Sequence, residues 1–210
     1  MTNVNPTSAF KACYIMQQED IRKFADTLAD GFSEYDMFKQ ICGGTYDMDK
    51  MRLFWAVSLA LLPNNAICIA DSESANSVLI YVRSNSKEPG LLAYIRKGGL
   101  KMLFKLGLKV VLRLVRLEVD MQRVAKRYKG SNDGYLVAFA TRLDKQGQHY
   151  GKPLMMALLN HLDQTGEGCY LETLKATNVE LYQHFSFQLK ESTPIQLGDL
   201  TLFAMHRPGK

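Results

Sequence analysis

The segment from residue 135 to 174 constrains the fold more than any other part of the chain. Residues 135–141 are mostly apolar, which is typical of a strand that is covered on both faces. A helical pattern follows over residues 150–164, and after a turn at 166–168 a second apolar strand spans 169–174. Two strands joined through a crossover helix run parallel, so this segment predicts a parallel βαβ unit and an α/β fold.

The remaining patterns surround this unit with antiparallel strands and helices. Helices are expected at 18–32, at 47–62 between the N-cap Asp47 and Pro63, and at 178–185. Strands are expected at 9–16, at 66–70 and 77–83 as a hairpin, and at 187–190 and 200–207 as an antiparallel pair. We therefore predict a single α/β domain over residues 1–210. Its mixed, mostly antiparallel sheet has a central parallel βαβ unit and flanking helices.

Positive charge is concentrated in residues 91–130. This segment holds eleven Lys or Arg against two acidic residues, a charge of +9, so the rest of the +5 chain carries −4. We predict a helical basic insertion of two helices, broken near Gly98-Gly99 or Gly107. The cations from Lys97 to Arg113 recur every four residues, opposite Leu100, Leu103, Phe104 and Leu108. We interpret this row as a solvated helix face; a membrane- or nucleic-acid-binding surface is the alternative.

Cysteine spacing and the N-terminus predict a reducing location. The four cysteines, Cys13, Cys42, Cys68 and Cys169, are widely separated in the sequence. They form no C-x-x-C motif and have no histidine pair nearby, so neither a disulfide framework nor a metal site is expected. The first twenty residues lack an apolar core of signal-peptide length. Pro63 interrupts the long uncharged run at 53–70, so a helix followed by a strand explains that run better than a membrane span. We predict a cytoplasmic protein.

A turn between the predicted strand at 135–141 and the helix at 150–164 has the character of a phosphate site. It reads Gln146-Gly147-Gln148-His149-Tyr150-Gly151-Lys152, and a helix start presents unpaired N–H groups and a positive dipole. The spacing does not match a P-loop or a dinucleotide fingerprint. A purely structural turn is the alternative.

The tail LETLKATNVELYQHFSF, together with this turn, resembles the GNAT superfamily of N-acyltransferases. In that family a strand leads to a loop [Q/R]-x-x-G-x-[G/A] and a helix, and the tail often reads L-E-T-x-x-x-x-N-x-x-x-Y-x-x-x-G-F. The likeness is greatest to the branch that includes puromycin N-acetyltransferase and covers about residues 133–207, the expected cofactor-binding half. His149 stands where the loop has its first glycine, and Ser186 stands where the tail has a glycine.

The resemblance implies a function and a set of site residues. Acetyl-CoA would bind with its pyrophosphate on the N–H groups of residues 148–152 and its pantetheine arm along the strand, where a backbone N–H would also hold the oxyanion. Tyr182 would protonate the leaving thiolate, and Asn178 would bond the cofactor arm or the helix start. The implied cofactor-binding residues are Phe139, Ala140, Thr141, Gln146, Gly147, Gln148, His149, Tyr150, Gly151, Lys152 and Asn178.

The acceptor side is less specified by the sequence. Glu172 is the best candidate for the base, with a structural carboxylate as the alternative. Residues 31–46 are rich in aromatics and form either a pocket wall or core packing, and Glu34, Asp36 and Asp47 nearby would suit a cationic amine. His161 is expected at the surface. We predict an N-acetyltransferase for a small-molecule primary amine, with no nucleic-acid or membrane partner, acting as a monomer or homodimer. A non-catalytic acyl-CoA-binding module and a surface binder that uses the basic segment are the alternatives.

Overall fold

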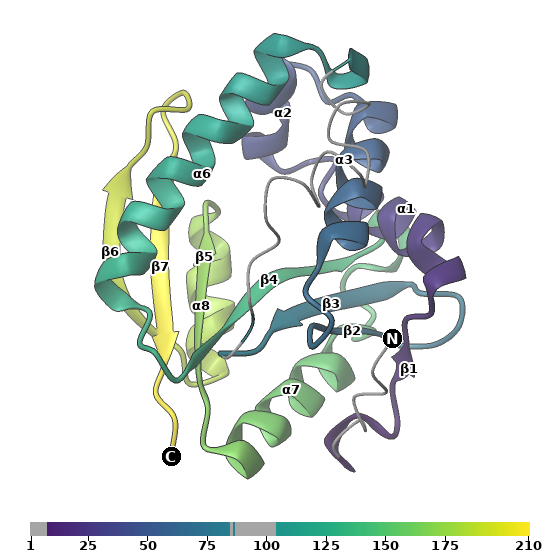
Figure 1. The fold of residues 1–210 in the computed structure, drawn as a ribbon, viewed down its shortest axis with the longest axis vertical. Helices are drawn as coiled ribbons and strands as arrows, with labels where there is room; N and C mark the ends of the chain where they lie inside the picture. The colour runs from purple at the N-terminus through teal and green to yellow at the C-terminus, as the bar shows by residue number, and fades with distance from the viewer. Residues whose placement is uncertain (1–7, 85, 87–103) are drawn as a thin grey trace.

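The computed structural model describes residues 8–84, 86 and 104–210. Its centre is a seven-stranded sheet in the order β1-β2-β3-β4-β5-β7-β6 (Figure 1). All neighbouring strands are antiparallel except β4 and β5, which are parallel. The predicted fold class is therefore confirmed. The strands are β1 (Tyr14–Ile15), β2 (Ile67–Ala70), β3 (Ser77–Val82), β4 (Asp133–Thr141), β5 (Gly168–Thr173), β6 (Gln188–Pro194) and β7 (Thr201–Arg207).

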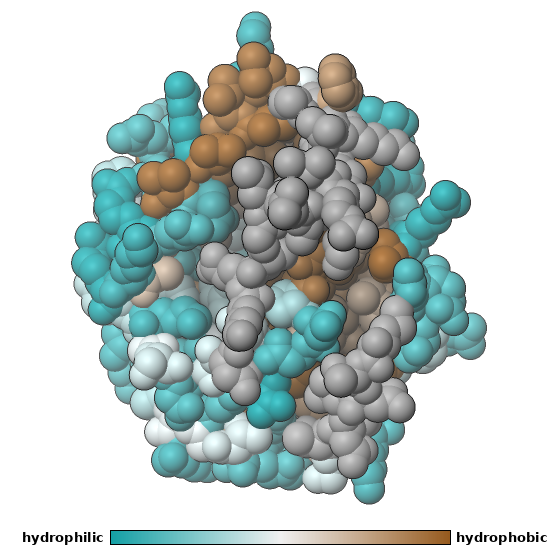
Figure 2. Space-filling view, viewed as in Figure 1, coloured by the Kyte–Doolittle hydropathy of each residue, from teal (hydrophilic) through white to brown (hydrophobic). Residues whose placement is uncertain are grey.

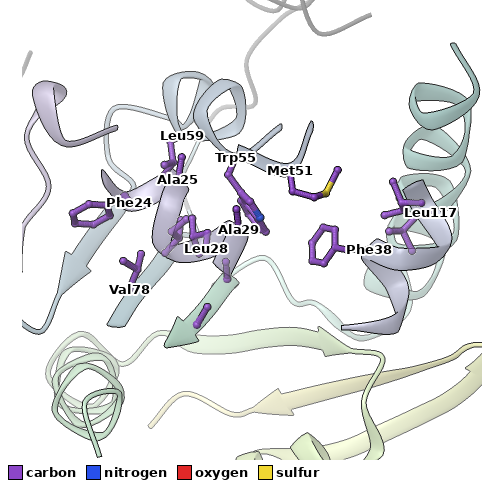
Figure 3. Close-up of a cluster of buried hydrophobic side chains, with 14 of the residues drawn as sticks. Phe24, Ala25, Leu28, Ala29, Phe38, Met51, Trp55, Leu59, Val78 and Leu117 are labelled. Atoms are coloured by element: carbon purple, nitrogen blue, oxygen red, sulfur yellow. The ribbon is translucent and has the colours of Figure 1, made fainter. Parts of the chain in front are cut away.

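Helices cover both faces of the sheet, and each face has its own core. One face carries α1 (Ile21–Gly31), α2 (Asp36–Cys42), α3 (Met48–Leu61) and α6 (Leu108–Tyr128). Figure 3 shows side chains of α1, α3 and the sheet, among them Leu28, Trp55 and Val78, gathered in this first core. The other face carries α7 (Lys152–Thr165) and α8 (Ala176–His184), whose core includes Leu154 and Leu171.

The residues expected to begin or end helices act as the sequence predicts. The Asp47 carboxylate accepts the backbone N–H of Lys50 at 3.1 Å and caps α3, which ends just before Pro63. α6 begins directly after Gly107, whose φ is +83°, so this predicted break is confirmed. The predicted break at Gly98-Gly99 lies outside the described residues.

One prediction about the N-terminal part is wrong, and one helix there was not predicted. The strand expected at 9–16 is reduced to Tyr14–Ile15, because Ser8–Phe10 forms a 3-10 turn that buries Phe10 in the second core. Within residues 31–46 the short helix α2 was missed, since its seven residues are too few to show a helical period. Phe38 and Ile41 of α2 are buried, so core packing is the correct alternative for this aromatic stretch.

Candidate active site

Strands β4 and β5 separate after three paired positions. The pairs are Asp133 with Gly168, Gly134 with Cys169, and Tyr135 with Tyr170. β4 then continues along β3 to Thr141, and β5 continues along β7 to Thr173. Residues 136–141 and 171–173, called here the β4–β5 fork, therefore have facing edges with no strand partner in the described sheet.

A β-bulge lies in β4 where the fork begins. Ile80 pairs with Ala138 and Tyr81 pairs with Leu136, which leaves Val137 without a partner on β3. A bulge turns the backbone out of its regular ladder, and bulges are common beside active sites. Here the bulge changes the direction of β4 at the point where β5 leaves it.

The loop after β4 is tied to the end of α1. The backbone N–H of Leu143 donates to the Asp30 carboxylate at 2.8 Å. The Gln146 side-chain amide donates to the carbonyl of Thr141 at 3.1 Å and lies 3.5 Å from that of Gly31. A Cβ on Gly31 would come within 2.6 Å of the Thr141 carbonyl oxygen, so a side chain cannot be placed there without moving the helix. Gln146 therefore holds the loop on α1 and β4, a role that the sequence did not predict.

Backbone N–H groups remain free where this loop enters α7. Of the five predicted phosphate donors at 148–152, Gln148 donates to the carbonyl of Lys145 and Lys152 to that of His149. The N–H groups of His149, Tyr150 and Gly151 have no acceptor among the described residues. α7 is fourteen residues long, so its positive end adds to these donors. The turn can accept an anion at three neighbouring amides.

The loop glycines and His149 show why the sequence pattern favours glycine here. Gly147 has a φ of +75° and His149 has a φ of +66°, in the left-handed region that costs a residue with a Cβ about 1–2 kcal/mol. A glycine at position 149 would adopt this φ without that cost. Gly151 is needed for packing instead, because a Cβ there would lie 2.6 Å from the Phe139 ring.

Glu172 lies in the fork and faces the helices of the first core. Its Oε2 accepts the Tyr135 hydroxyl at 2.6 Å, and no cation pairs with it in the described structure. The pKa of this carboxyl is raised to about 7, chiefly by burial and also by the nearby Glu118 carboxylate, against hydrogen bonds from Tyr135 and Tyr170 that lower it. A carboxyl with that pKa exchanges protons near neutral pH, as a general base must.

A cavity of about 300 Å³ adjoins Glu172, between α6 and the sheet. Its lining includes Glu118, Gln122 and Met121 of α6 together with Tyr135 and Glu172. The lining also includes Arg83 and Lys129, so the cavity carries two carboxyl groups and two cations. The lining does not include the carboxylates proposed from composition, Glu34, Asp36 and Asp47, and Asp47 is used as the α3 cap.

Tyr182 lies on the other face of the fork. It belongs to the second core with Leu171, whereas Tyr170 belongs to the first core, so Glu172 and Tyr182 lie on opposite sides of β5. Its side chain is only 8% exposed and packs edge-on against Phe187. Burial and the nearby Tyr35 raise the pKa of the Tyr182 hydroxyl, so it stays protonated at neutral pH.

A hydrogen-bonded group closes the far end of the fork. Asn178 donates to Thr173 Oγ1 at 3.1 Å, and the Tyr35 hydroxyl lies 2.8 Å from the same oxygen. The backbone N–H of Leu174 donates to the Tyr35 hydroxyl at 2.8 Å. Asn178, in the first turn of α8, thus bonds the end of β5; its predicted bond to the cofactor arm stays a prediction. The sequence named Tyr35 only as one of several aromatics and did not find Thr173, because their contact spans 138 positions of the chain.

The prediction that His161 lies at the surface is wrong. It is fully buried in α7, packs against Phe10, and its Nε2 lies 3.7 Å from a Glu167 oxygen. Glu167 also accepts the hydroxyls of Tyr81 and Ser84, at the end of the sheet away from the fork.

A larger open depression of about 1090 Å³ runs along α7 toward the C-terminus. Pro153 and Met156 line one end of it, and none of the residues predicted to bind cofactor does. Volume alone therefore does not identify the site; the free amides and the fork do.

The strand order, the single parallel pair and the helices on both faces are those of the GNAT acetyltransferase fold. No family profile matches the chain, and no curated protein sequence matches it significantly. The branch that includes puromycin N-acetyltransferase is not confirmed.

Solved structures extend this fold over nearly the whole chain. A Corynebacterium glutamicum protein described as histone acetyltransferase HPA2 and related acetyltransferase is 19% identical, with a TM-score of 0.57 over 95% of this chain and 97% of that one. The C-terminal condensation domain of Ebony, in complex with beta-alanyl-dopamine, is 10% identical with a TM-score of 0.63 over 93% and 97%. An agmatine N-acetyltransferase is 9% identical with a TM-score of 0.55 over 93% and 98%.

Proposed function

We propose that this protein is an acetyl-CoA-dependent N-acetyltransferase that transfers the acetyl group directly to a primary amine of a small molecule. The observation that carries the proposal is the placement of Glu172 and Tyr182 on opposite faces of the β4–β5 fork. In a direct transfer the amine adds to the thioester carbon and the thiolate then leaves it, so nitrogen and sulfur are two different substituents of one tetrahedral intermediate. A base and an acid that approach the fork from different faces can each serve one of these atoms.

The chain's backbone fits the donor substrate. The three free amides at His149, Tyr150 and Gly151 suit the pyrophosphate of CoA, at the positive end of α7. The unpaired edge of β4 at Phe139, Ala140 and Thr141 suits the amide groups of a pantetheine arm, which need backbone partners. Four free cysteines accord with the reducing cytoplasm in which we expect the enzyme to work.

The proposed chemistry assigns one proton transfer to each face. Glu172, with a pKa of about 7, takes a proton from the acceptor ammonium, and the neutral amine attacks the thioester carbon. A backbone N–H of β4 near the Val137 bulge stabilises the oxyanion. When the C–S bond breaks, Tyr182 gives its proton to the sulfur. The second proton lost by the attacking nitrogen passes through solvent and restores the Tyr182 hydroxyl. The amide bond forms as the thioester breaks, and no acyl-enzyme is required.

The cavity beside α6 is the proposed acceptor site. Within a lining that also carries Arg83 and Lys129, Glu118 and Glu172 are the groups that would hold the ammonium form of the acceptor. Because a condensation domain shares the fold, the fold alone does not fix the acyl donor. The assignment to CoA rests on the free amides of the loop.

Ligand binding and turnover test the proposal in that order. Saturating acetyl-CoA should raise the melting temperature, by the equivalent of about 2.7 kcal/mol at a hundred times its dissociation constant. CoA release is then measured over a panel of primary amines. With an active amine, kcat/KM should rise with pH around 7 as Glu172 ionises. This rise of kcat/KM with pH should be absent in Glu172→Gln. An unchanged melting temperature at millimolar acetyl-CoA would contradict the donor assignment.

Binding without turnover would favour the second candidate, a non-catalytic acyl-CoA-binding module. His149 favours that candidate, since its side chain occupies a loop position that the family keeps free. The oligomeric state, monomer or homodimer, remains a prediction from the sequence.

A further inference from the structure

A group of large apolar side chains on α6, together with Phe104 of the helical turn before Gly107, projects into solvent. Their exposed fractions are 83% for Phe104, 62% for Leu108, 48% for Leu112, 54% for Val115 and 58% for Val119. The last four are spaced by four, three and four residues, which places them in one line on the helix. We call these five residues the α6 ridge. Figure 2 shows apolar surface gathered along the upper part of the molecule, over the position of α6 in Figure 1.

The sequence placed Phe104 and Leu108 opposite a row of cations that we interpreted as a solvated helix face. In the structure Lys105 and Lys109 of that row are exposed, and so are Phe104 and Leu108. The core is instead contacted by a different row that includes Val110, Leu117 and Val124, and the Arg113 guanidinium donates to the Ile41 carbonyl at 3.2 Å. α6 therefore has two apolar rows, of which one remains exposed.

Unpaired cations accompany the ridge. Lys105, Lys109, Arg116 and Lys126 make no ion pair or hydrogen bond with any described residue. Arg123 is already paired with Asp120. The segment 91–130 carries +9 and the rest of the chain −4, so the molecule is strongly asymmetric in charge. An anionic partner would be drawn to this side.

We propose that the α6 ridge docks on the surface of an anionic lipid bilayer. An apolar row flanked by Lys and Arg is the arrangement of helices that lie in the membrane interface. A second copy of the chain is disfavoured, because pairing two ridges would bring their cations together. Side chains about half exposed or more form a protruding edge, which fits a deformable headgroup layer better than the rigid surface of a folded protein. No helix in the described ranges has the length and apolarity to cross the membrane, so the contact is peripheral.

This inference changes the expectation that the protein has no membrane partner. It does not depend on the proposed catalysis, because none of the ridge residues lines the fork or the acceptor cavity.

Vesicle co-sedimentation of the full-length protein tests the proposal. We expect binding to vesicles of phosphatidylcholine containing phosphatidylglycerol at low salt, much weaker binding at high salt, and little binding to phosphatidylcholine alone. The double variant Leu112→Ser/Val115→Ser should weaken binding by about tenfold or more. Lys109→Gln and Arg116→Gln should each weaken it by about fivefold.

The matched control changes an exposed leucine and an exposed lysine on another part of the surface. Leu189 of β6 is 40% exposed, and Lys190 beside it is also exposed. Leu189→Ser/Lys190→Gln should leave vesicle binding unchanged. Circular dichroism and melting temperature should be close to wild type for all these surface variants, so loss of binding would not reflect unfolding.

Three outcomes would overturn the proposal. They are absence of binding to the anionic vesicles at low salt, equal loss of binding in the control and ridge variants, and binding that does not respond to the ridge variants. Light scattering distinguishes a subunit interface from a membrane-binding surface. A dimer that dissociates in Leu112→Ser/Val115→Ser, without vesicle binding by the wild type, would identify the ridge as a subunit interface instead.

Discussion

At the scale of single residues, Glu172 shows a conflict between stability and proposed function. Its pKa is raised to about 7 in the folded protein, against about 4.3 for an ordinary glutamate. The folded state therefore holds this proton more tightly than the unfolded state does. Stability falls as pH rises from about 4.3 to 7, and the full cost of burying the carboxylate applies above pH 7.

Replacing Glu172 by Gln should stabilise the protein while it abolishes turnover. At pH 8 we expect the free energy of unfolding to rise by about 1–3 kcal/mol, since the neutral amide avoids burial of a charge. At pH 4 the gain should disappear. Turnover should fall by roughly 10²–10⁴-fold. Urea unfolding at both pH values measures the first effect, and a variant less stable than wild type at pH 8 would show that the carboxylate has a structural role.

Tyr182→Phe removes only a hydroxyl from the opposite face of the fork. We expect turnover to fall by roughly 10²–10⁴-fold with little change in acetyl-CoA affinity, because only proton donation is lost. Tyr35→Phe is the matched control, since that hydroxyl bonds Thr173 and the backbone of Leu174. Tyr35→Phe should lower the free energy of unfolding by about 1 kcal/mol. Full turnover in Tyr182→Phe would make Tyr182 a packing residue.

His149→Gly should stabilise the fold by about 1 kcal/mol, because glycine accepts the φ of +66° without strain. Its effect on acetyl-CoA binding then identifies what the imidazole does. Tighter binding means that the side chain crowds the phosphates. Weaker binding means that the ring donates to them. Titration calorimetry separates the two, and equal affinity of the variant and the wild type would place the ring away from the ligand.

At the scale of elements, the start of α7 depends on the absence of a side chain at Gly151. Gly151→Ala would place a methyl group 2.6 Å from the Phe139 ring and push α7 away from β4. We expect a loss of about 1–3 kcal/mol in stability and weaker acetyl-CoA binding, since the free amides move with the helix. The double variant Gly151→Ala/Phe139→Leu should recover part of both by removing the clashing ring atoms. Failure to recover either would locate the damage elsewhere.

The elements that the sequence predicts best are those with clear helix-start and helix-stop residues. The Asp47 cap, the Pro63 stop and the Gly107 break fix α3 and the start of α6 locally, so no distant contact was needed to find them. The two faces of α6 could not be assigned in that way. Both rows are apolar, and their placement depends on contacts with elements that are far away in the sequence, such as the Arg113 contact with α2.

The same reasoning separates the predicted and unpredicted parts of the site. Tyr182, Glu172 and the loop amides follow from local sequence and a family resemblance. The Tyr135 bond to Glu172 spans 37 positions and the Tyr35 bond to Thr173 spans 138, so they appear only after the chain has folded.

At the scale of the whole molecule, Glu167 joins three parts of the fold that are distant in the sequence. It accepts hydroxyls from Tyr81 of β3 and from Ser84, and His161 of α7 lies beside it. Despite its burial, these contacts and the nearby Arg83 lower the pKa of Glu167 to about 2. Its contribution to stability is therefore complete above about pH 4.3 and is lost as pH falls toward 2.

Glu167→Gln should cost about 2–4 kcal/mol at pH 7 and flatten the loss of stability between about pH 4 and 2. Asp144→Asn is a control, because that carboxylate is mostly exposed on the surface loop. The pH dependence of unfolding by urea measures both. An identical acid profile in Glu167→Gln and the wild type would contradict the proposed contribution.

The fork also has a mechanical consequence. Three residue pairs join the leaf formed by β1 to β4 to the leaf formed by β5 to β7, fewer than join any other neighbouring strands except the short edge pair β1–β2. A ligand chain lying in the fork would supply hydrogen bonds that the two leaves do not make to each other. A bound ligand would then connect the two parts of the sheet as an additional strand does. When the product leaves, those hydrogen bonds are lost and the two parts are again joined only by their own pairs.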